Sequence, residues 1–518
     1  MLFLASYVRN PFRDEKDRLF VLVLSLLCFV YVLPIIMANR YYVDDLGRSM
    51  MGYTRWAENG RPLADILMKV FGFTGRGERI VDLFPLTLLM AVAAFVYFSF
   101  CYYRAHFDHG RPILAALLLF FPFINPFFLE NLSYRFDSLT MMLSLVLVMA
   151  AYLERELSWC TMVIASLLFF LSLCLYQAVI GFFVILAMIE ALLAYCDRQQ
   201  LVMARSILRA LFARMMQLLL AYLLYALLIK PKYAAAAYTA KHSELLTPNL
   251  EGLHQLWQHM LFFNDKIAQS IADMPLFIPA YLMVATLGAL LWLIRARHRL
   301  LAERMVGGAL LEGVLSVGIL LSPALAFVMS FLPLSVFTEP VTFVRVLISY
   351  SGFLLWMAVV LLLGVGRWRL APLLALPAIW FALIFSYAYG TAMGEQKIYD
   401  QYLATNIAAK IHEADPKVEK RLFLYGMQRV SPVLENAASR YRLIGDLVPV
   451  YLKKNWNWGV RFLNHFGVEN LWADHIEDEI LPKLCTLTPI YQSRDFSLLE
   501  TGDVLILALQ PPACGEGK

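Results

Sequence analysis

Two adjacent carboxylates open the first long polar segment of the chain. Asp44 and Asp45 follow an apolar run that ends near Met37, and Arg48 comes one helical turn after Asp44. Neighbouring carboxylates disfavour joint ionisation, so one of the two is suited to take up a proton. A carboxylate can act as a general base when it lies beside the hydroxyl group that it deprotonates. The pair therefore predicts catalysis, although an Asp before a helix is also a favoured N-cap.

A second set of polar residues has the chemistry to bind a phosphate or a sugar. Guanidinium groups present forked donors that match phosphate oxygens. Arginines and aromatic residues near span ends also snorkel to headgroups or form interfacial belts, and Arg48 could simply pair with Asp44. The substrate-binding candidates are Arg48, Trp56, Arg61, Tyr134, Arg135, Asp137, Gln177 and Arg345.

The spacing of apolar residues predicts how the acidic segment is held. Leu46, Met50 and Tyr53 recur at helical spacing, with charged residues between them. This pattern is typical of an amphipathic helix that lies in the membrane interface with its charged face toward water. Pro62 begins another apolar repeat, so a second short helix is expected there.

Composition places the chain among membrane proteins. Hydrophobic residues make up 60% of it and charged residues 16%, against about 25% charged in soluble domains. The mean hydropathy is +0.64. The net charge of +5 is modest and spread over short basic clusters, which favours membrane orientation over nucleic-acid binding.

Apolar runs predict about eleven transmembrane helices. The first, Leu19 to Met37, is long enough to cross about 30 Å of hydrocarbon. The sequence therefore predicts a mostly α fold, a polytopic membrane helix bundle over residues 1–390 with a catalytic loop at 38–81. The other spans are expected at about 82–103, 112–129, 138–153, 159–174, 178–195, 215–230, 276–294, 308–331, 346–365 and 370–389.

Arginines predict the orientation of these spans. Arg104, Arg214 and Arg367 fall in alternate connections, and basic connections stay in the cytoplasm. The N-terminus is then cytoplasmic, while the acidic loop and the chain after the last span lie outside. Arg40 and Arg55 keep positive charge on the disfavoured side, which suggests an anionic ligand there.

The tail, residues 391–518, has the composition of a small soluble α/β domain. Residues 421–427 alternate like a strand, 432–451 have a helical pattern, and 496–509 predict a hairpin that turns at Thr501 to Asp503.

The seven cysteines show neither CxxC spacing nor pairing with histidines, so no metal or redox motif is expected. Cys485 and Cys514 could form a disulfide if the tail lies in an oxidising compartment. Asp44 and Asp45 could hold Mg²⁺ or Mn²⁺ with water molecules. No further ligand set is recognisable, so no obligatory cofactor is expected.

Many spans, an acidic first outside loop and an outside tail are what a lipid-dependent transferase of GT-C type needs. No nucleotide sugar is present outside the inner membrane, so sugar transfer there requires a donor on a polyprenyl phosphate. Glycoside hydrolases use a second carboxyl group to protonate the departing oxygen. A phosphate already leaves easily, so one base suffices, while cations receive the developing negative charge.

Three segments carry a resemblance to a known family. DDLGRSMMGYTRWAENGRPL, ENLSYRFDSLTMM and SLCLYQAVIGFF resemble the type II O-antigen glucosyltransferases of serotype-converting prophages, over about residues 20–390. The resemblance implies inverting transfer of a glucosyl group from undecaprenyl-phosphate glucose to an O-antigen repeat unit of lipopolysaccharide, on the periplasmic side of the bacterial inner membrane. It also implies that Asp44 or Asp45 is the acidic catalytic residue, with Arg48, Arg135 and Asp137 as neighbouring site residues.

Two other functions fit the same composition. A lipid-linked sugar flippase or transporter would carry out no chemistry, and it should show broken helices and mid-membrane charges in two related halves. An O-antigen polymerase would also use outside arginines, but its product is a long polymer instead of a single side branch.

Overall fold

The computed structural model describes residues 10, 14–75, 77–107, 110–154, 158–197, 202–233, 242–303, 309–473 and 476–511. Contacts between residues divide the chain into two compact units. The bundle unit comprises residues 1–33, 54–78 and 83–387, and the mixed unit comprises residues 34–53, 79–82 and 388–518. The division of the chain into folding domains near residue 390 stays a prediction.

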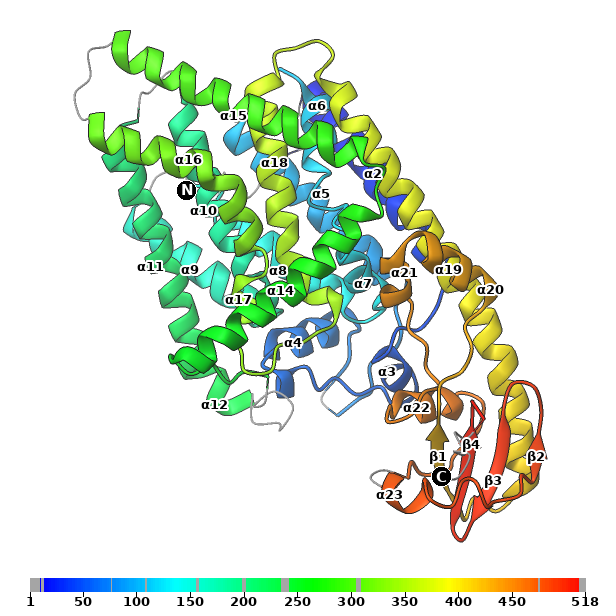
Figure 1. Cartoon of the computed structure of the whole chain (residues 1–518). Helices are drawn as coiled ribbons and strands as arrows, with labels where there is room; N and C mark the ends of the chain where they lie inside the picture. The colour runs from blue at the N-terminus through cyan, green and yellow to red at the C-terminus, as the bar shows by residue number, and fades with distance from the viewer. Residues whose placement is uncertain are drawn as a thin grey trace. The chain divides into compact units, whose positions relative to one another are not determined.

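The bundle unit is built from apolar helices (Figure 1). Over the described residues, eight helical segments are long and apolar enough to cross a membrane. They contain α2 (Glu15–Ala38), α5 (Leu86–His106), η2 (Gln177–Val179) with α10 (Ile180–Cys196), α11 (Ala204–Leu228) with α12 (Lys230–Tyr233), α15 (Phe277–Glu303), α16 (Ala309–Met329), η3 (Val344–Ser349) with α18 (Tyr350–Val365), and α19 (Ala371–Ala414). The predicted polytopic helical membrane fold is confirmed.

Shorter helices complete this unit. Two of them, α8 (Ser138–Ala150) and α9 (Trp159–Leu173), are apolar but shorter than the other spans. The rest are η1 (Ala57–Asn59), α4 (Pro62–Phe71), α6 (Pro112–Leu119), α7 (Phe128–Ser133), α14 (Leu250–Ala272) and α17 (Leu332–Ser335).

The continuous helix predicted at 112–129 is wrong. Helix α6 ends at Leu119, and turns lead to α7. Pro126 cannot donate a helical hydrogen bond, and Asn125 instead donates from Nδ2 to the Leu347 carbonyl and to Ser351 Oγ, both at 3.1 Å. This buried turn therefore anchors the chain to η3 and α18.

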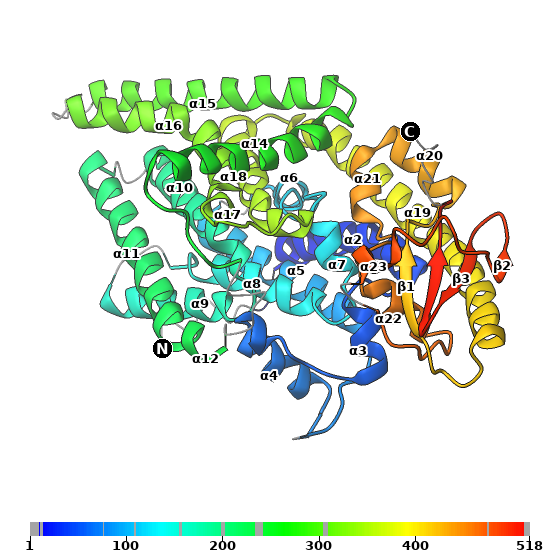
Figure 2. The same ribbon diagram turned by 60° about the horizontal axis from the view of Figure 1, so that its bottom comes forward.

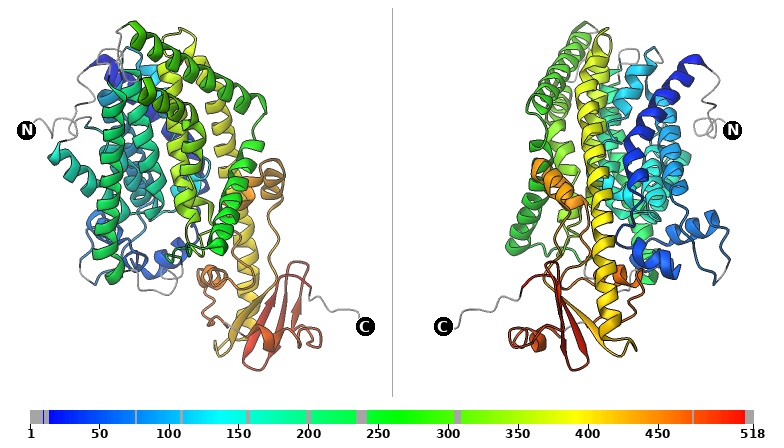
Figure 3. Two further views of the ribbon diagram at one scale, coloured as in Figure 1. Left: turned by 60° about the vertical axis from the view of Figure 1, so that its left-hand side comes forward. Right: turned by 90° about the vertical axis from the view of Figure 1, so that its right-hand side faces the viewer.

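Neighbouring helices pack in a continuous series within the bundle unit: α5 on α8, α8 on α9, α9 on α11, α11 on α10, α10 on α18, and α18 on α15 (Figure 3). The most apolar stretch of the η3–α18 segment is 72% buried, against 28% for that of α11 and α12. Helix α18 is thus central, and α11 presents apolar residues outward, as a lipid-facing helix does.

Two buried ion pairs join helices of the bundle. Arg214 meets Glu190 at 2.6 Å, and Arg297 meets Glu312 at 3.0 Å. Such pairs leave no bare charge in the apolar environment.

The mixed unit contains a four-stranded sheet in the order β1-β4-β3-β2 (Figure 2). Its strands are β1 (Arg421–Tyr425), β2 (Tyr491–Gln492), β3 (Ser497–Thr501) and β4 (Val504–Ala508). Strand β1 is parallel to β4, and β3 and β4 form the hairpin predicted at 496–509. Both the predicted strand and the predicted hairpin are confirmed.

Alternation along the strands gives the sheet two apolar faces. Leu422, Leu424 and the matching β4 residues pack with Leu403 to Ile411 of α19. Phe423 faces the other way and packs with Ile476 and Ile480. The helices of this unit are α3 (Asp45–Met51), α20 (Pro432–Arg440), α21 (Arg442–Leu447), α22 (Trp458–Asn464) and α23 (Glu477–Ile480), and α19 contributes its residues from 388 onward.

Cysteine pairing follows the sequence prediction in part. Cys485 in the mixed unit is disulfide-bonded. Cys514, its predicted partner, lies outside the described residues. Cys28, Cys101, Cys160, Cys174 and Cys196, all in the bundle unit, are free.

Candidate functional site

The two predicted catalytic carboxylates have different environments in the mixed unit. Asp45 is fully buried, and one of its carboxylate oxygens accepts a hydrogen bond of 3.0 Å from the backbone N–H of Tyr42. Asp44 is the N-cap residue of α3, but its side chain makes no capping hydrogen bond. It stays 27% exposed and meets Arg48 at 3.6 Å. Asp44 is therefore the more accessible of the two.

The amphipathic helix predicted over residues 45–59 is wrong in its length and in the exposure of its charged residues. Helix α3 has only seven residues, and its charged residues Asp45 and Arg48 are buried. The helix ends because Gly52 adopts a left-handed conformation (φ 63°), and a Cβ there would lie 2.4 Å from Cβ of Arg79. The second helix predicted at Pro62 is confirmed as α4.

Tail residues of the same unit hold the segment before and within α3. Arg40 is buried, and its guanidinium group meets Asp400 at 2.6 Å. The Tyr42 hydroxyl donates to the Leu447 carbonyl at 2.5 Å. The backbone just before Asp44 is therefore fixed by groups more than 350 residues away in the chain.

His465 adds a contact to α3 itself. Its Nε2 lies 3.0 Å from the Leu46 carbonyl oxygen, so this nitrogen is the donor. Burial lowers the pKa of His465 below its usual 6.5, and the hydrogen bond to Leu46 opposes that shift. The neutral imidazole with its proton on Nε2 satisfies this contact.

In the bundle unit, Asp137 gathers two of the predicted substrate-binding residues. Its Oδ1 accepts hydrogen bonds from Nε1 of Trp56 at 2.7 Å and from Arg61 at 3.2 Å. All three side chains are largely buried. Asp65 accepts from the backbone N–H groups of Trp56 and Ala57, at 3.0 and 2.9 Å. The carboxylates of Asp137 and Asp65 thus fix the start of the segment 56–60, which contains η1.

Gln177 holds the end of the segment 56–60. Its Nε2 lies 3.2 Å from the Asn59 carbonyl, 3.0 Å from the Gly60 carbonyl and 2.7 Å from the Tyr225 hydroxyl. Gly60 adopts φ 72°, and a Cβ there would lie 2.2 Å from the Tyr225 oxygen. Glycine is therefore required both by the backbone and by the close approach of α11.

Arg345 lies beside an acidic residue of α7. Its guanidinium group is 3.7 Å from Glu130, and its backbone N–H donates to the same carboxylate at 2.8 Å. The guanidinium group also lies over the Tyr134 ring, 4.9 Å from the ring centre. Arg345 keeps 14% exposure, and the Tyr134 ring is buried.

Arg135 precedes Phe136 in the turn between α7 and α8 and is mostly buried. Its guanidinium group lies over the Phe84 ring, 4.5 Å from the ring centre, and its carbonyl accepts from Thr87 at 2.7 Å.

Several residues with important contacts were not among the sequence candidates. Glu130 stood in the quoted ENLSYRFD turn, but nothing in the sequence indicated its pairing with a residue 215 positions away. The sequence indicates Arg40 only through its charge. Asp65 follows Pro62 by three residues, which is a typical place for an acidic group in the first turn of a helix. No sequence pattern indicates a role for Asp400 or His465.

Over the described residues, no group of three or more His, Cys, Asp or Glu side chains could hold a metal ion. The roles of all the candidate residues, and the independence of the reaction from metals, stay proposals.

Apolar spans combined with a polar segment that exposes a carboxylate define a polytopic membrane protein with a candidate general base. The chain belongs to the family described as glucosyl transferase GtrII, whose model matches residues 33–356, more than half of its length. It is therefore a membrane glycosyltransferase. All three segments of the sequence resemblance lie inside the matched region, and the predicted family is confirmed.

One similar protein comes from a bacteriophage. An uncharacterized 55.3 kDa protein in the gtrB 5' region of Salmonella phage P22 is 25% identical over 448 residues, which cover 86% of this chain and 89% of that protein. No solved structure matches the chain.

Proposed function

We propose that the protein transfers a glucosyl group from undecaprenyl-phosphate glucose to a hydroxyl of a lipopolysaccharide O-antigen repeat unit. The reaction takes place at the periplasmic face of the bacterial inner membrane. Membership of the GtrII glucosyltransferase family and the membrane-spanning helices support this proposal. The single structural observation behind it is the partly exposed Asp44 carboxylate, just after the first long apolar helix.

Asp44, not Asp45, is the proposed base. A base must reach the proton that it removes, and Asp45 is fully buried with an oxygen already bonded to the Tyr42 N–H. The Arg48 guanidinium, 3.6 Å from Asp44, orients this carboxylate. Asp45 is a positioning residue that fixes the first turn of α3.

The proposed reaction is a single displacement. The acceptor oxygen bonds to the anomeric carbon while the bond from that carbon to the phosphate oxygen breaks. The acceptor proton passes to the Asp44 carboxylate, and the electron pair of the broken bond stays on the lipid phosphate. One displacement inverts the anomeric configuration. The phosphate needs no acid to leave, so a second carboxylic acid is not required.

Arg345 is the best candidate to receive the charge on the phosphate. It keeps some exposure and sits at 3.7 Å from Glu130, so its donors are not all engaged by that carboxylate. Arg135 is the second candidate, and Tyr134 packs under Arg345. The contacts of Trp56, Arg61, Asp137 and Gln177 support positioning roles.

The cysteines support the proposed orientation. Disulfides persist in oxidising compartments such as the periplasm and are rare in the cytoplasm. The disulfide-bonded Cys485 belongs to the mixed unit, which also contains Asp44. A periplasmic location of that unit agrees with the basic cytoplasmic connections of the bundle.

Purified protein incubated with radiolabelled undecaprenyl-phosphate glucose and delipidated O-polysaccharide tests the proposed function. We expect label to enter the glycan as a single inverted glucosyl branch, identified by linkage analysis. EDTA should leave the rate unchanged. Donor movement across vesicles without label in the glycan, or elongation of the polymer, would contradict the proposal.

A further inference from the structure

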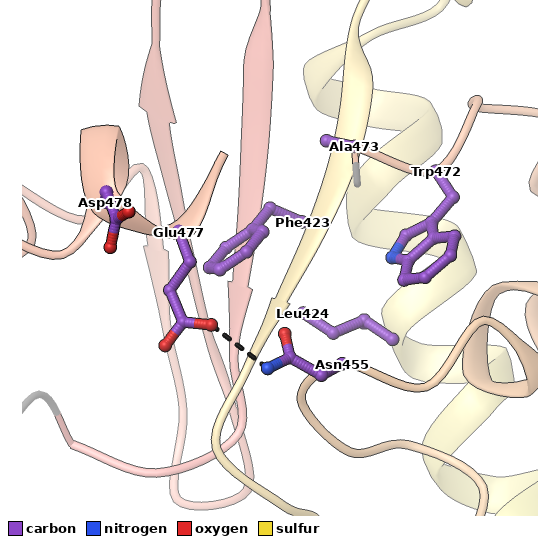
Figure 4. A pocket seen from close by; sticks show the side chains of 7 residues that line it. All are labelled: Phe423, Leu424, Asn455, Trp472, Ala473, Glu477 and Asp478. Atoms are coloured by element: carbon purple, nitrogen blue, oxygen red, sulfur yellow. Dashed lines mark hydrogen bonds between the residues drawn. The ribbon is translucent and has the colours of Figure 1, made fainter. Parts of the chain in front are cut away.

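A pocket of about 550 Å³ lies in the mixed unit at the outer edge of the sheet (Figure 4). Phe423 and Leu424 of β1 line it, together with Trp472, Asn455 and Glu477. This volume falls within the range of about 300–1,000 Å³ that is typical of small-molecule sites. None of these residues belongs to the proposed reaction centre.

The backbone of β1 supplies polar groups at this edge. Arg421 donates to Asp503 beside β4, and Leu509 donates to the Tyr425 carbonyl, so alternate residues of β1 face β4. Leu422 faces the opposite side, where it bonds to Leu471 and Ala473. Leu424 is two residues on and directs its N–H and C=O to that same side. The pocket therefore borders backbone donors and acceptors.

The side chains combine two aromatic rings, those of Phe423 and Trp472, with fixed polar groups. Nδ2 of Asn455 donates to Glu477 at 3.0 Å, as Figure 4 shows, and Lys454 pairs with the same carboxylate. These hydrogen bonds hold the pKa of Glu477 below its usual range. Asp478 adds a second carboxylate to the lining. Aromatic rings and hydroxyl-binding groups in one lining suit a sugar ring, which has apolar C–H faces and polar edges.

We propose that this pocket binds an uncharged sugar of the acceptor glycan, a role that rests on the proposed glycosyl transfer. The two carboxylates in the lining repel a lipid phosphate and so disfavour the donor. They accept hydrogen bonds from sugar hydroxyls instead. The mixed unit thus supplies both the proposed base and a subsite for the substrate that the base deprotonates.

Binding of delipidated O-polysaccharide to the purified full-length protein, without donor, tests this subsite by titration calorimetry. Trp472→Ala removes the indole ring from the lining. Asn455→Gly removes the amide and keeps the backbone, because Asn455 has φ 57°, which glycine tolerates. We expect each change to weaken binding about tenfold, the equivalent of losing one good contact. In transfer assays the acceptor KM should rise and the donor KM should stay constant.

Leu471→Ala is the matched control, because the Leu471 side chain is 75% exposed and does not line the pocket. If Trp472→Ala fails to fold, the glycan affinity of Asn455→Gly alone tests the subsite. Wild-type affinity in both pocket variants, or no binding of glycan to the wild type, would overturn the proposal. Glycan binding that is weakened by the pocket variants in a protein without transfer activity would support the subsite and reject the proposed function. Asp44→Asn should still bind the glycan.

Discussion

Two Asp–Arg pairs of the chain have the same chemistry but lie in different environments. In the mixed unit, Asp44 is 27% exposed and lies 3.6 Å from Arg48 within one helix. In the bundle unit, Asp137 is only 2% exposed and lies 3.2 Å from Arg61. Asp137 also accepts a hydrogen bond of 2.7 Å from the Trp56 indole.

We propose that this difference separates a reactive carboxylate from a structural one. The Asp137 carboxylate has its charge and a lone pair satisfied by two donors from one polar segment, so its contacts support anchoring of that segment. The Asp44 carboxylate is held by a single longer contact and remains open to a substrate. Identical residue types therefore have different expected roles because of burial and the number of donors around them.

Replacing the anchoring carboxylate should cause the largest loss of stability. Asp137→Ala leaves Arg61 charged and buried without its partner and leaves the Trp56 N–H without its acceptor. Removing one member of a buried pair costs about 3–5 kcal/mol. Thermal unfolding in detergent should show this loss of folded protein.

The exposed pair of Arg55 and Glu58 is the control for that change. These side chains are 70% and 60% exposed and lie 3.8 Å apart. Exposed pairs contribute about 0–1 kcal/mol, so Glu58→Ala should barely shift the unfolding temperature. Equal shifts in the two variants would show that Asp137 is not an anchor.

Gly60→Ala should give the next largest effect. The substitution strains a backbone with φ 72° and pushes a methyl group toward the Tyr225 hydroxyl. A strained backbone of this kind costs about 1–3 kcal/mol. Gly77→Ala is matched in backbone, with φ 83° and open space at the Cβ position. A greater loss of thermal stability in Gly60→Ala would isolate the contact with α11, and equal losses would exclude it.

Acidification should weaken the mixed unit by a smaller amount through His465. Burial lowers the pKa of His465 in the folded protein below its usual 6.5. As pH falls below that value, the unfolded chain takes up the proton first, so stability declines until the folded imidazole is also protonated. His465→Gln should flatten the pH dependence of amide exchange in α3. An unchanged pH dependence in this variant would show that another group is responsible.

Local patterns in the sequence predicted the apolar spans, the helix at Pro62 and the hairpin of β3 and β4, because each of these depends on neighbouring residues. The early end of α3 could not be predicted in this way. Gly52 is required by the approach of Arg79, and Gly60 by the approach of Tyr225, which lies 165 positions further on. The helical spacing of apolar residues over 45–59 does not indicate the contact of Gly52 with Arg79 or that of Gly60 with Tyr225.

The candidate site was predictable by residue type but not by role. The sequence indicated Asp44, Asp45 and the arginines, since carboxylates and guanidinium groups after a first span suit sugar transfer from a lipid phosphate. It could not separate Asp44 from Asp45, because burial of Asp45 depends on tertiary packing of α3. The partners of Asp137 come from a segment 76 positions away, so its anchoring contacts were also invisible.

The rate of glucosyl transfer by Asp44→Asn and Asp45→Asn, measured side by side with saturating undecaprenyl-phosphate glucose and glycan, tests the central claim most directly. Loss of a general base lowers the rate by about 10²–10⁴-fold. We expect that loss for Asp44→Asn, with unchanged thermal stability. We expect a much smaller effect for Asp45→Asn, because its amide oxygen can still accept a hydrogen bond from the Tyr42 N–H. Wild-type transfer by Asp44→Asn would contradict the assignment of Asp44 as the base.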